Sequence, residues 1–245
     1  MRVALLFIDG VGVGRRAPEE NPLAEAGHLL SQFHDAPGHP LPHGGECVPV
    51  DATFGVPGRP QSASNQTAIL TGLPAPVRVG GHVLGFPNAA LRALLAEHSL
   101  VRRLVEAGRS ATFANAYPAG YLDALGLARR PSPVPDIVLP PGSLRRLRPS
   151  ASTLAFAAGR VPLRTLEDAR QDEGLAHDVT GARARAHGLD TPLRTPEEAA
   201  RVFWRIAAQA DFTFFEHYLA DEAGHAQDWT AARSALGHHR AGAGL

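Results

Sequence analysis

Four residues in three separate segments carry side chains suited to metal-assisted chemistry. Asp9 directly follows an apolar run, and Ser62 opens a segment that changes from polar to apolar. Asp221 and His225 stand four positions apart late in the chain, so a single turn can present both on one side. Carboxylate oxygens and imidazole nitrogens are common ligands of divalent cations, and a cation lowers the pKa of a bound hydroxyl. Asp9, Asp221 and His225 are therefore candidate cation ligands, and Ser62 is a candidate nucleophile.

The segment that begins at Ser62 has the pattern of a helix that runs inward to Leu70 and stops before Gly72. Backbone N–H groups and the helix macrodipole stabilise negative charge at such a helix start. A serine alkoxide or a bound phosphoryl group would be favoured there. The alternative is that Ser62 or Ser64 serves only as the N-cap of this helix.

Asp9 lies at the end of Val3–Ile8, a nearly continuous apolar run that predicts a buried central strand of a parallel sheet. Open α/β sheets bind ligands outside the carboxyl ends of their strands, where a carboxylate can hold a hard cation. Ordinary alternatives stay open for both acidic segments. Asp9 could simply cap the following loop, and Asp221 with His225 could belong to a polar, solvent-exposed loop.

Strand-like and helix-like segments alternate along the chain, which predicts an α/β fold with a mostly parallel central sheet flanked by helices. The other expected elements are, in chain order, an irregular loop over 34–60, a helix over 88–107 ended by Gly108, a strand Ser110–Ala116, a helix Glu197–Ala210 opened by Thr195 as N-cap and Pro196, and a second central strand Asp211–Tyr218.

Three motifs occur in a fixed order, and together they resemble the alkaline phosphatase superfamily of binuclear metalloenzymes. They are a strand ending in Asp-Gly, the segment SASNQTAILTG, and the late DEAGH. Within that superfamily the chain is most similar to small bacterial metalloenzyme-domain proteins related to cofactor-independent phosphoglycerate mutases and phosphopentomutases. The resemblance covers most of residues 1–232. It implies an alkaline phosphatase-like core.

The resemblance also implies a role for each candidate residue. Asp9 would bind the metal nearer the nucleophile, and Ser62 would coordinate that metal and form a covalent phosphoryl intermediate. Asp221 and His225 would bind a partner metal. The implied cofactors are two divalent ions, zinc or manganese and possibly magnesium, which at ~4 Å apart can clamp the attacking and leaving oxygens. The implied activity is phosphomonoester hydrolysis or phosphomutase chemistry on a small phosphorylated substrate.

Further metal ligands of the family pattern, an Asp-His pair and a later His after another strand, are not found. Twenty residues follow His225, and the helical pattern of Trp229–Leu236 gives way to a Gly/Ala-rich tail. His238 and His239 in that tail offer imidazoles, but no strand or Asp precedes them. We therefore expect an incomplete metal site and a truncated or frame-shifted chain. The alternative function is a catalytically inactive remnant of the fold with weak or no metal binding.

Three further residues are weaker substrate-binding candidates. Asn21 and Asn65 could donate hydrogen bonds to a phosphate, although turn and helix-start roles compete. His82 lies on a loop after the serine segment and could contact substrate. Arginine can hold phosphate bidentately, but the sequence does not single out one of its 24 arginines.

The core is expected in residues 1–117 and 193–245, with an insert or cap over 118–192. Proline and arginine become dense from about residue 118 and helical periodicity is lost there. A long, partly ordered loop is the alternative for this region.

Composition excludes several other classes of function. The net charge is +0, which argues against a nucleic-acid partner or an anionic membrane partner. All 24 basic residues are arginine, so no lysine nucleophile exists, and the single Cys47 excludes an intramolecular disulfide or a cysteine-cluster zinc site. No apolar run approaches ~18 residues, so we expect a cytoplasmic protein. A nucleotide-binding fold stays as a remote alternative, because the loop after the first strand is Gly-x-Gly-x-Gly without a P-loop lysine.

Overall fold

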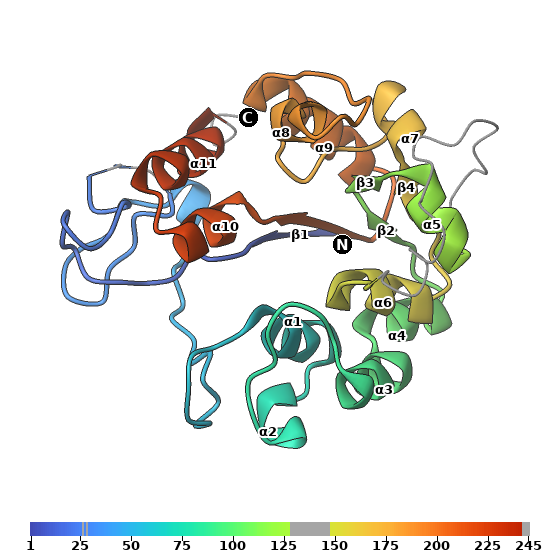
Figure 1. The fold of residues 1–245 in the computed structure, drawn as a ribbon, viewed down its shortest axis with the longest axis horizontal. Coiled ribbons are helices and arrows are strands. Elements are labelled where there is room, and N and C mark those ends of the chain that lie inside the picture. The colour runs from blue at the N-terminus through green and yellow to red at the C-terminus, as the bar shows by residue number, and fades with distance from the viewer. Residues whose placement is uncertain (26, 28, 128–147, 242–245) are drawn as a thin grey trace.

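A computed structural model describes residues 1–25, 27, 29–127 and 148–241, without the side chains of 238–241. Its main sheet has three parallel strands in the order β1-β5-β2, and helices cover both faces (Figure 1). The strands are β1 Val3–Ile8, β5 Phe212–His217 and β2 Ala111–Phe113. The predicted α/β class is confirmed.

The central strand of this sheet is β5, in which every residue is buried. The expectation that Val3–Ile8 is also central is wrong for the described chain, because β1 pairs only with β5 there. Two apolar residues of this edge strand are exposed to solvent, Val3 at 44% and Leu6 at 49%. The apolar run marked a strand correctly but did not reveal its neighbours.

The predicted strand Ser110–Ala116 is divided between two sheets. Its first part is β2, and Ala116–Tyr117 forms β3, which pairs in parallel with β4 Arg164–Thr165. Between them, Asn115 donates its side-chain amide to the Glu216 carbonyl at 2.8 Å and leaves the ladder with β5. The chain thus changes partner at Asn115.

The two faces of the sheet carry separate apolar cores because neighbouring side chains of β5 alternate. Phe214 packs with Phe113 and Phe156 on the face covered by α1, α3, α4 and α6. Phe215 packs against Phe203 of α9 on the opposite face. Figure 1 shows these two helical layers on either side of the strands. These helices are α1 Ser62–Thr71, α3 Ala89–His98, α4 Leu100–Glu106, α6 Ala151–Ala158 and α9 Pro196–Ala207.

Local signals account for where several helices begin and end. Thr195 caps α9 in a capping box with Glu198, as its position predicts. The expected single helix over 88–107 is two helices, because the Ser99 hydroxyl caps α4 and also donates to the Ala155 carbonyl at 2.8 Å. Gly108 then follows the end of α4 with a left-handed φ of 72°.

The remaining helices connect these layers. They are η1 Pro42–Gly44, α2 Ala75–Val79, α5 Ala119–Leu125, α7 Leu166–Arg170, α8 Ala182–Ala186, α10 Leu219–Ala226 and α11 Trp229–Ala241. The expected loss of helix after Leu236 is wrong, because α11 continues to Ala241. No described helix is long and apolar enough to cross a membrane.

The region expected as an insert contributes to the main core. Leu122 of α5 and Phe156 of α6 are fully buried with Phe113 and Phe214. The boundaries at 118 and 192 stay a prediction, and residues 128–147 lie outside the described chain. Helices α5 and α6 therefore form part of the helical layer on one face of the sheet.

Gly10 allows the end of β1 to lie directly against the start of α10. Its φ is +77°, and a Cβ atom there would stand 2.5 Å from the Cα and backbone nitrogen of Asp221. Glycine alone satisfies both conditions, since it tolerates positive φ and has no side chain to clash. The approach brings the segment after Asp9 against the backbone of Asp221.

We predict that Gly10→Ala lowers the free energy of unfolding by about 2–4 kcal/mol, because it combines left-handed strain with a backbone clash. Urea denaturation measures this change. Gly12→Ala is the matched control, since a methyl group at Gly12 would meet nothing within 4 Å and the φ of Gly12 is not left-handed. Equal stability of the two variants would contradict the account of Gly10.

Candidate functional site

A pocket of about 460 Å³ lies at the carboxyl ends of β1 and β5, beside the start of α1 and one face of α10. It brings together all four leading candidates from the three motif segments: Asp9, Ser62, Asp221 and His225. The strands of an open α/β sheet end where ligands are usually bound. The fold therefore gathers these distant residues at one place.

Asp9 and Ser62 line the same part of this pocket. The Asp9 carboxylate accepts from the Gly10 backbone at 3.1 Å and from the Gln66 amide at 3.5 Å, and the Ser62 hydroxyl is close enough to lower its pKa. Burial raises the pKa of Asp9, the Ser62 hydrogen bond lowers it, and the neighbouring negative charge of Asp221 raises it; the net direction is upward. The Asp9 carboxylate is thus held in place, partly desolvated and close to a second acid.

Asp221 and His225 lie one turn apart on α10, as their spacing predicts. The His225 Nε2 atom is 3.5 Å from Asp221 Oδ1, and their side chains are 52% and 30% exposed. The alternative of a polar loop is wrong, because both residues are in α10. Their shared face of the helix opens toward Ser62 in the same pocket.

Ser62 is the first residue of α1, and the N-cap is Gln61, which makes no side-chain capping bond. Ser64 donates its hydroxyl to the Gln61 carbonyl at 3.1 Å and accepts from the Val83 backbone at 3.2 Å. Neither serine is therefore the N-cap of this helix. Ser62 is left at the helix start with its hydroxyl directed to Asp9, while Ser64 joins α1 to the following loop.

The donor chemistry of the pocket fits a hard divalent cation only in part. Two carboxylates, a hydroxyl and an imidazole line it, and the mutual repulsion that raises the Asp9 pKa would be relieved by a positive ion. Across the described residues, however, no group of three or more His, Cys, Asp or Glu side chains is close enough to hold a metal. This set suits an ion that keeps several waters, as magnesium does, better than a zinc site with three protein ligands.

Of the weaker candidates, only Asn65 lies in this pocket. Its Oδ1 atom is buried without a hydrogen-bond partner among the described residues, so the amide has capacity for a ligand. His82 bonds the Val56 carbonyl at 3.2 Å and so supports the loop that precedes Ser62. Asn21 donates to the Arg15 carbonyl at 2.8 Å and accepts from the Leu23 backbone at 3.0 Å, which is a turn role.

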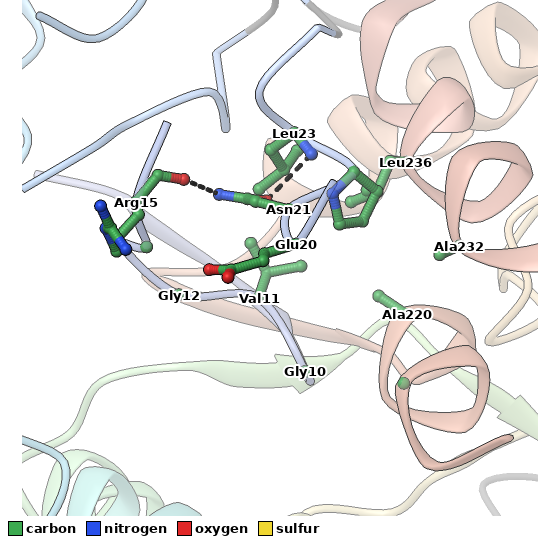
Figure 2. A pocket seen from close by; sticks show the side chains of 13 residues that line it. Gly10, Val11, Gly12, Arg15, Glu20, Asn21, Leu23, Ala220, Ala232 and Leu236 are labelled. Carbon is green, nitrogen blue, oxygen red and sulfur yellow. Dashed lines mark hydrogen bonds between the residues drawn. The ribbon is translucent and has the colours of Figure 1, made fainter. Parts of the chain in front are cut away.

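Asn21 instead lines an adjoining pocket of about 320 Å³ between helices α10 and α11 and the loop of residues 10–14, which we call the glycine loop (Figure 2). The figure shows Gly10 and Gly12 on one side and Ala220, Ala232 and Leu236 on the other. Gly10, Val11 and Gly224 line both pockets, so the two spaces adjoin at the glycine loop.

Sequence reasoning missed Glu216, a fully buried carboxyl in β5. It accepts hydrogen bonds from Ser152 Oγ at 2.6 Å and Tyr117 Oη at 3.0 Å, and Tyr218 also bonds it. Burial raises its pKa to about 7, although these three hydrogen bonds lower it, and the charge of Asp9 raises it further. An acid inside the apolar strand Phe212–His217 was the available signal. The hydrogen bond from Gln66, one helical turn after Ser62, to Asp9 was also missed, because these residues are far apart in the sequence.

Comparisons of the chain with models of known families, with curated proteins and with solved structures find no match. The family resemblance therefore stays a prediction from the motifs.

We predict that Glu216 makes the protein less stable as the pH rises. Its pKa is about 7 when folded against 4.5 for the ordinary group, so the folded state binds the proton more tightly. The free energy of unfolding should then fall as pH rises from about 4.5 to 7, and the raised pKa of Asp9 adds a change of the same sign. Urea titrations in a chelating buffer should show a flatter pH dependence for Glu216→Gln. An unchanged slope in that variant, with the exposed control Glu106→Gln also unchanged, would contradict this role.

Proposed function

We propose that the protein is a metal-dependent phosphoryl-transfer enzyme, a phosphomonoester hydrolase or phosphomutase, with Ser62 as nucleophile. One observation carries the proposal. Asp9, Ser62, and the pair Asp221 and His225 come from three segments that are far apart in the sequence, yet they line one pocket at the ends of adjacent parallel strands. The substrate in this proposal is a small phosphorylated molecule, and a cavity of about 460 Å³ is consistent with its size.

In this proposal the Asp9 carboxylate orients the nucleophile by accepting the Ser62 hydroxyl hydrogen. Gln66 and the Gly10 backbone hold that carboxylate in turn. The start of α1, which lacks a side-chain cap, directs backbone N–H groups toward negative charge near Ser62. A divalent cation bound by the two acids would supply a lower hydroxyl pKa and charge neutralisation. Asp9 and Asp221 would hold it, with Ser62 and His225 beside them.

The reaction then follows an in-line displacement. The Ser62 oxygen forms a bond to phosphorus as the bond from phosphorus to the substrate oxygen breaks, and the proton that the Ser62 hydroxyl loses is taken up by the leaving oxygen, which departs as an alcohol. Water then takes the phosphoryl group from Ser62 in a hydrolase, whereas a substrate hydroxyl takes it in a mutase. The expected number of two metal ions, and their identity, stay predictions.

Arg59 is the arginine that we assign to the substrate phosphate. It lines the pocket three residues before Ser62 and has no hydrogen bond or ion pair with another described residue. Its guanidinium can donate two parallel hydrogen bonds to a phosphate. The chain has no lysine, and Arg59 is the arginine among the described residues that line this pocket.

An inactive remnant with weak metal binding is the second candidate. The observation that favours it is the lack of a group of three metal-ligating side chains among the described residues. The two candidates differ in whether Ser62 is phosphorylated and whether a cation binds.

We predict that Ser62→Ala lowers the turnover of an aryl phosphate, assayed with manganese or zinc, by at least about 1000-fold. The variant removes the only oxygen proposed to attack phosphorus. Ser64→Ala should retain the rate, because its hydroxyl is bonded to the Gln61 carbonyl and the Val83 backbone. Equal activity of wild type and Ser62→Ala would overturn the nucleophile assignment, and absence of activity in wild type would favour the remnant.

We predict that Arg59→Ala raises KM for the same substrate roughly 10- to 100-fold with a smaller effect on kcat, since a charge-assisted hydrogen bond to the ground-state phosphate is lost. Arg59→Lys should recover part of the affinity. Arg78→Ala, an exposed arginine away from the pocket, is the control for general charge. Matching KM values for Arg59→Ala and Arg78→Ala would remove Arg59 from the site.

A further inference from the structure

Another pocket, of about 380 Å³, is lined by residues of α9, the end of α7 and the loops that follow α7 and α8. Helix α9 lies on the sheet face opposite α1 (Figure 1). This pocket shares no lining residue with the pocket of Ser62. Four arginines line it, Arg170, Arg194, Arg201 and Arg205, against the two acids Asp172 and Glu198. Within this lining the arginines outnumber the acids four to two.

Two of the arginines are fixed by their partners and form the wall. The Arg194 side chain is 7% exposed, and its guanidinium donates to the Ala169 carbonyl and to Asp172 Oδ1 at 2.7 Å. Arg170 pairs with Glu167 at 2.6 Å and with Asp190 at 3.0 Å. These carboxylates hold both guanidinium groups in place and offset their charge, so Arg194 and Arg170 shape the wall and leave the other two arginines as donors for a ligand.

The other two arginines have most of their donors unused. Arg201 and Arg205 stand four positions apart on α9, an arrangement of like charges that destabilises a helix slightly. Arg205 is 3.8 Å from Asp172, and Arg201 has no hydrogen bond or ion pair with another described residue. Each guanidinium carries five N–H donors.

The acids of the pocket are already engaged. Glu198 accepts from the Thr195 backbone at 2.8 Å as part of the capping box of α9. Asp172 accepts from Arg194 and faces Arg205. Neither carboxylate forms an ion pair with Arg201 in the part of the chain that the structure describes.

We propose that this pocket binds a phosphate group, free or carried by a small molecule, with Arg201 and Arg205 as the main donors. Adjacent guanidinium groups bind phosphate oxygens through paired, charge-assisted hydrogen bonds. Leu193 and Val202 border the arginines and can contact a small apolar substituent on the phosphate. The site is independent of the reaction proposed at Ser62.

The first test is calorimetric titration of inorganic phosphate and of phenyl phosphate into the full chain in a chelating buffer. The double variant Arg201→Gln/Arg205→Gln should weaken binding at least about tenfold, because two charge-assisted contacts are lost. Arg78→Gln/Arg103→Gln removes the same charge from exposed positions elsewhere and should leave the affinity unchanged. Tighter binding of phenyl phosphate than of inorganic phosphate would identify a substituted phosphate as the ligand, and equal binding a free one.

The second test locates the ligand without a substitution. Phosphate should protect Arg201 and Arg205 from an arginine-specific dicarbonyl reagent, as read by peptide mass spectrometry. Protection of Arg59 alone would place phosphate only at the Ser62 pocket and overturn the proposal. An equal loss of affinity in the two double variants would overturn it as well, because general charge would then explain the binding.

Discussion

The close approach of Gly10 to Asp221 is the constraint on which the candidate site depends. Parallel pairing of Ile8 with His217 brings the ends of β1 and β5 to the same edge of the sheet. The missing side chain at Gly10 then lets α10 begin directly against the turn after β1. Asp9 and Asp221, far apart in sequence, consequently act on each other electrostatically. Without that contact, the two acidic motifs would be separate surface features.

Negative charge is concentrated around this contact. The charge of Asp221 raises the pKa of Asp9, and the charge of Asp9 raises the pKa of Glu216. Burial raises the pKa of both Asp9 and Glu216. Such an arrangement lowers stability unless protons or a cation offset it. Ser152, Tyr117 and Tyr218 offset it partly at Glu216 by donating hydrogen bonds to that carboxyl. At Asp9 the corresponding donors are Ser62, Gln66 and the Gly10 backbone, so a cation there would relieve a charge that hydrogen bonds leave in place.

Features coded by neighbouring residues could be predicted from the sequence. The α/β alternation, the helix that begins at Ser62 and the N-cap at Thr195 depend on side chains within a few positions. The convergence of Asp9, Ser62 and Asp221 was also predictable, because strand ends meet at one edge of a parallel sheet. Asn65, a candidate for substrate binding, lines the pocket of Ser62, whereas Asn21 forms the hydrogen bonds of a turn.

Features set by distant partners could not be predicted. The break at Ser99 depends on a hydrogen bond to Ala155, and the division of the strand at Asn115 depends on Glu216. The edge position of β1 follows from pairing that its own residues do not encode. The roles of Gln66 and Glu216 likewise appear only when their hydrogen-bond partners are known.

Binding of manganese to the full chain is the most direct test of the cation site that we propose at the acids beside Ser62. Electron paramagnetic resonance of free manganese gives the bound fraction during a titration. We predict saturable binding by wild type, because each site carboxylate contributes a charged ligand. The affinity should fall at least about tenfold in Asp9→Asn and Asp221→Asn and stay unchanged in the exposed control Asp123→Asn. No binding at millimolar manganese, or equal binding by all four proteins, would contradict it.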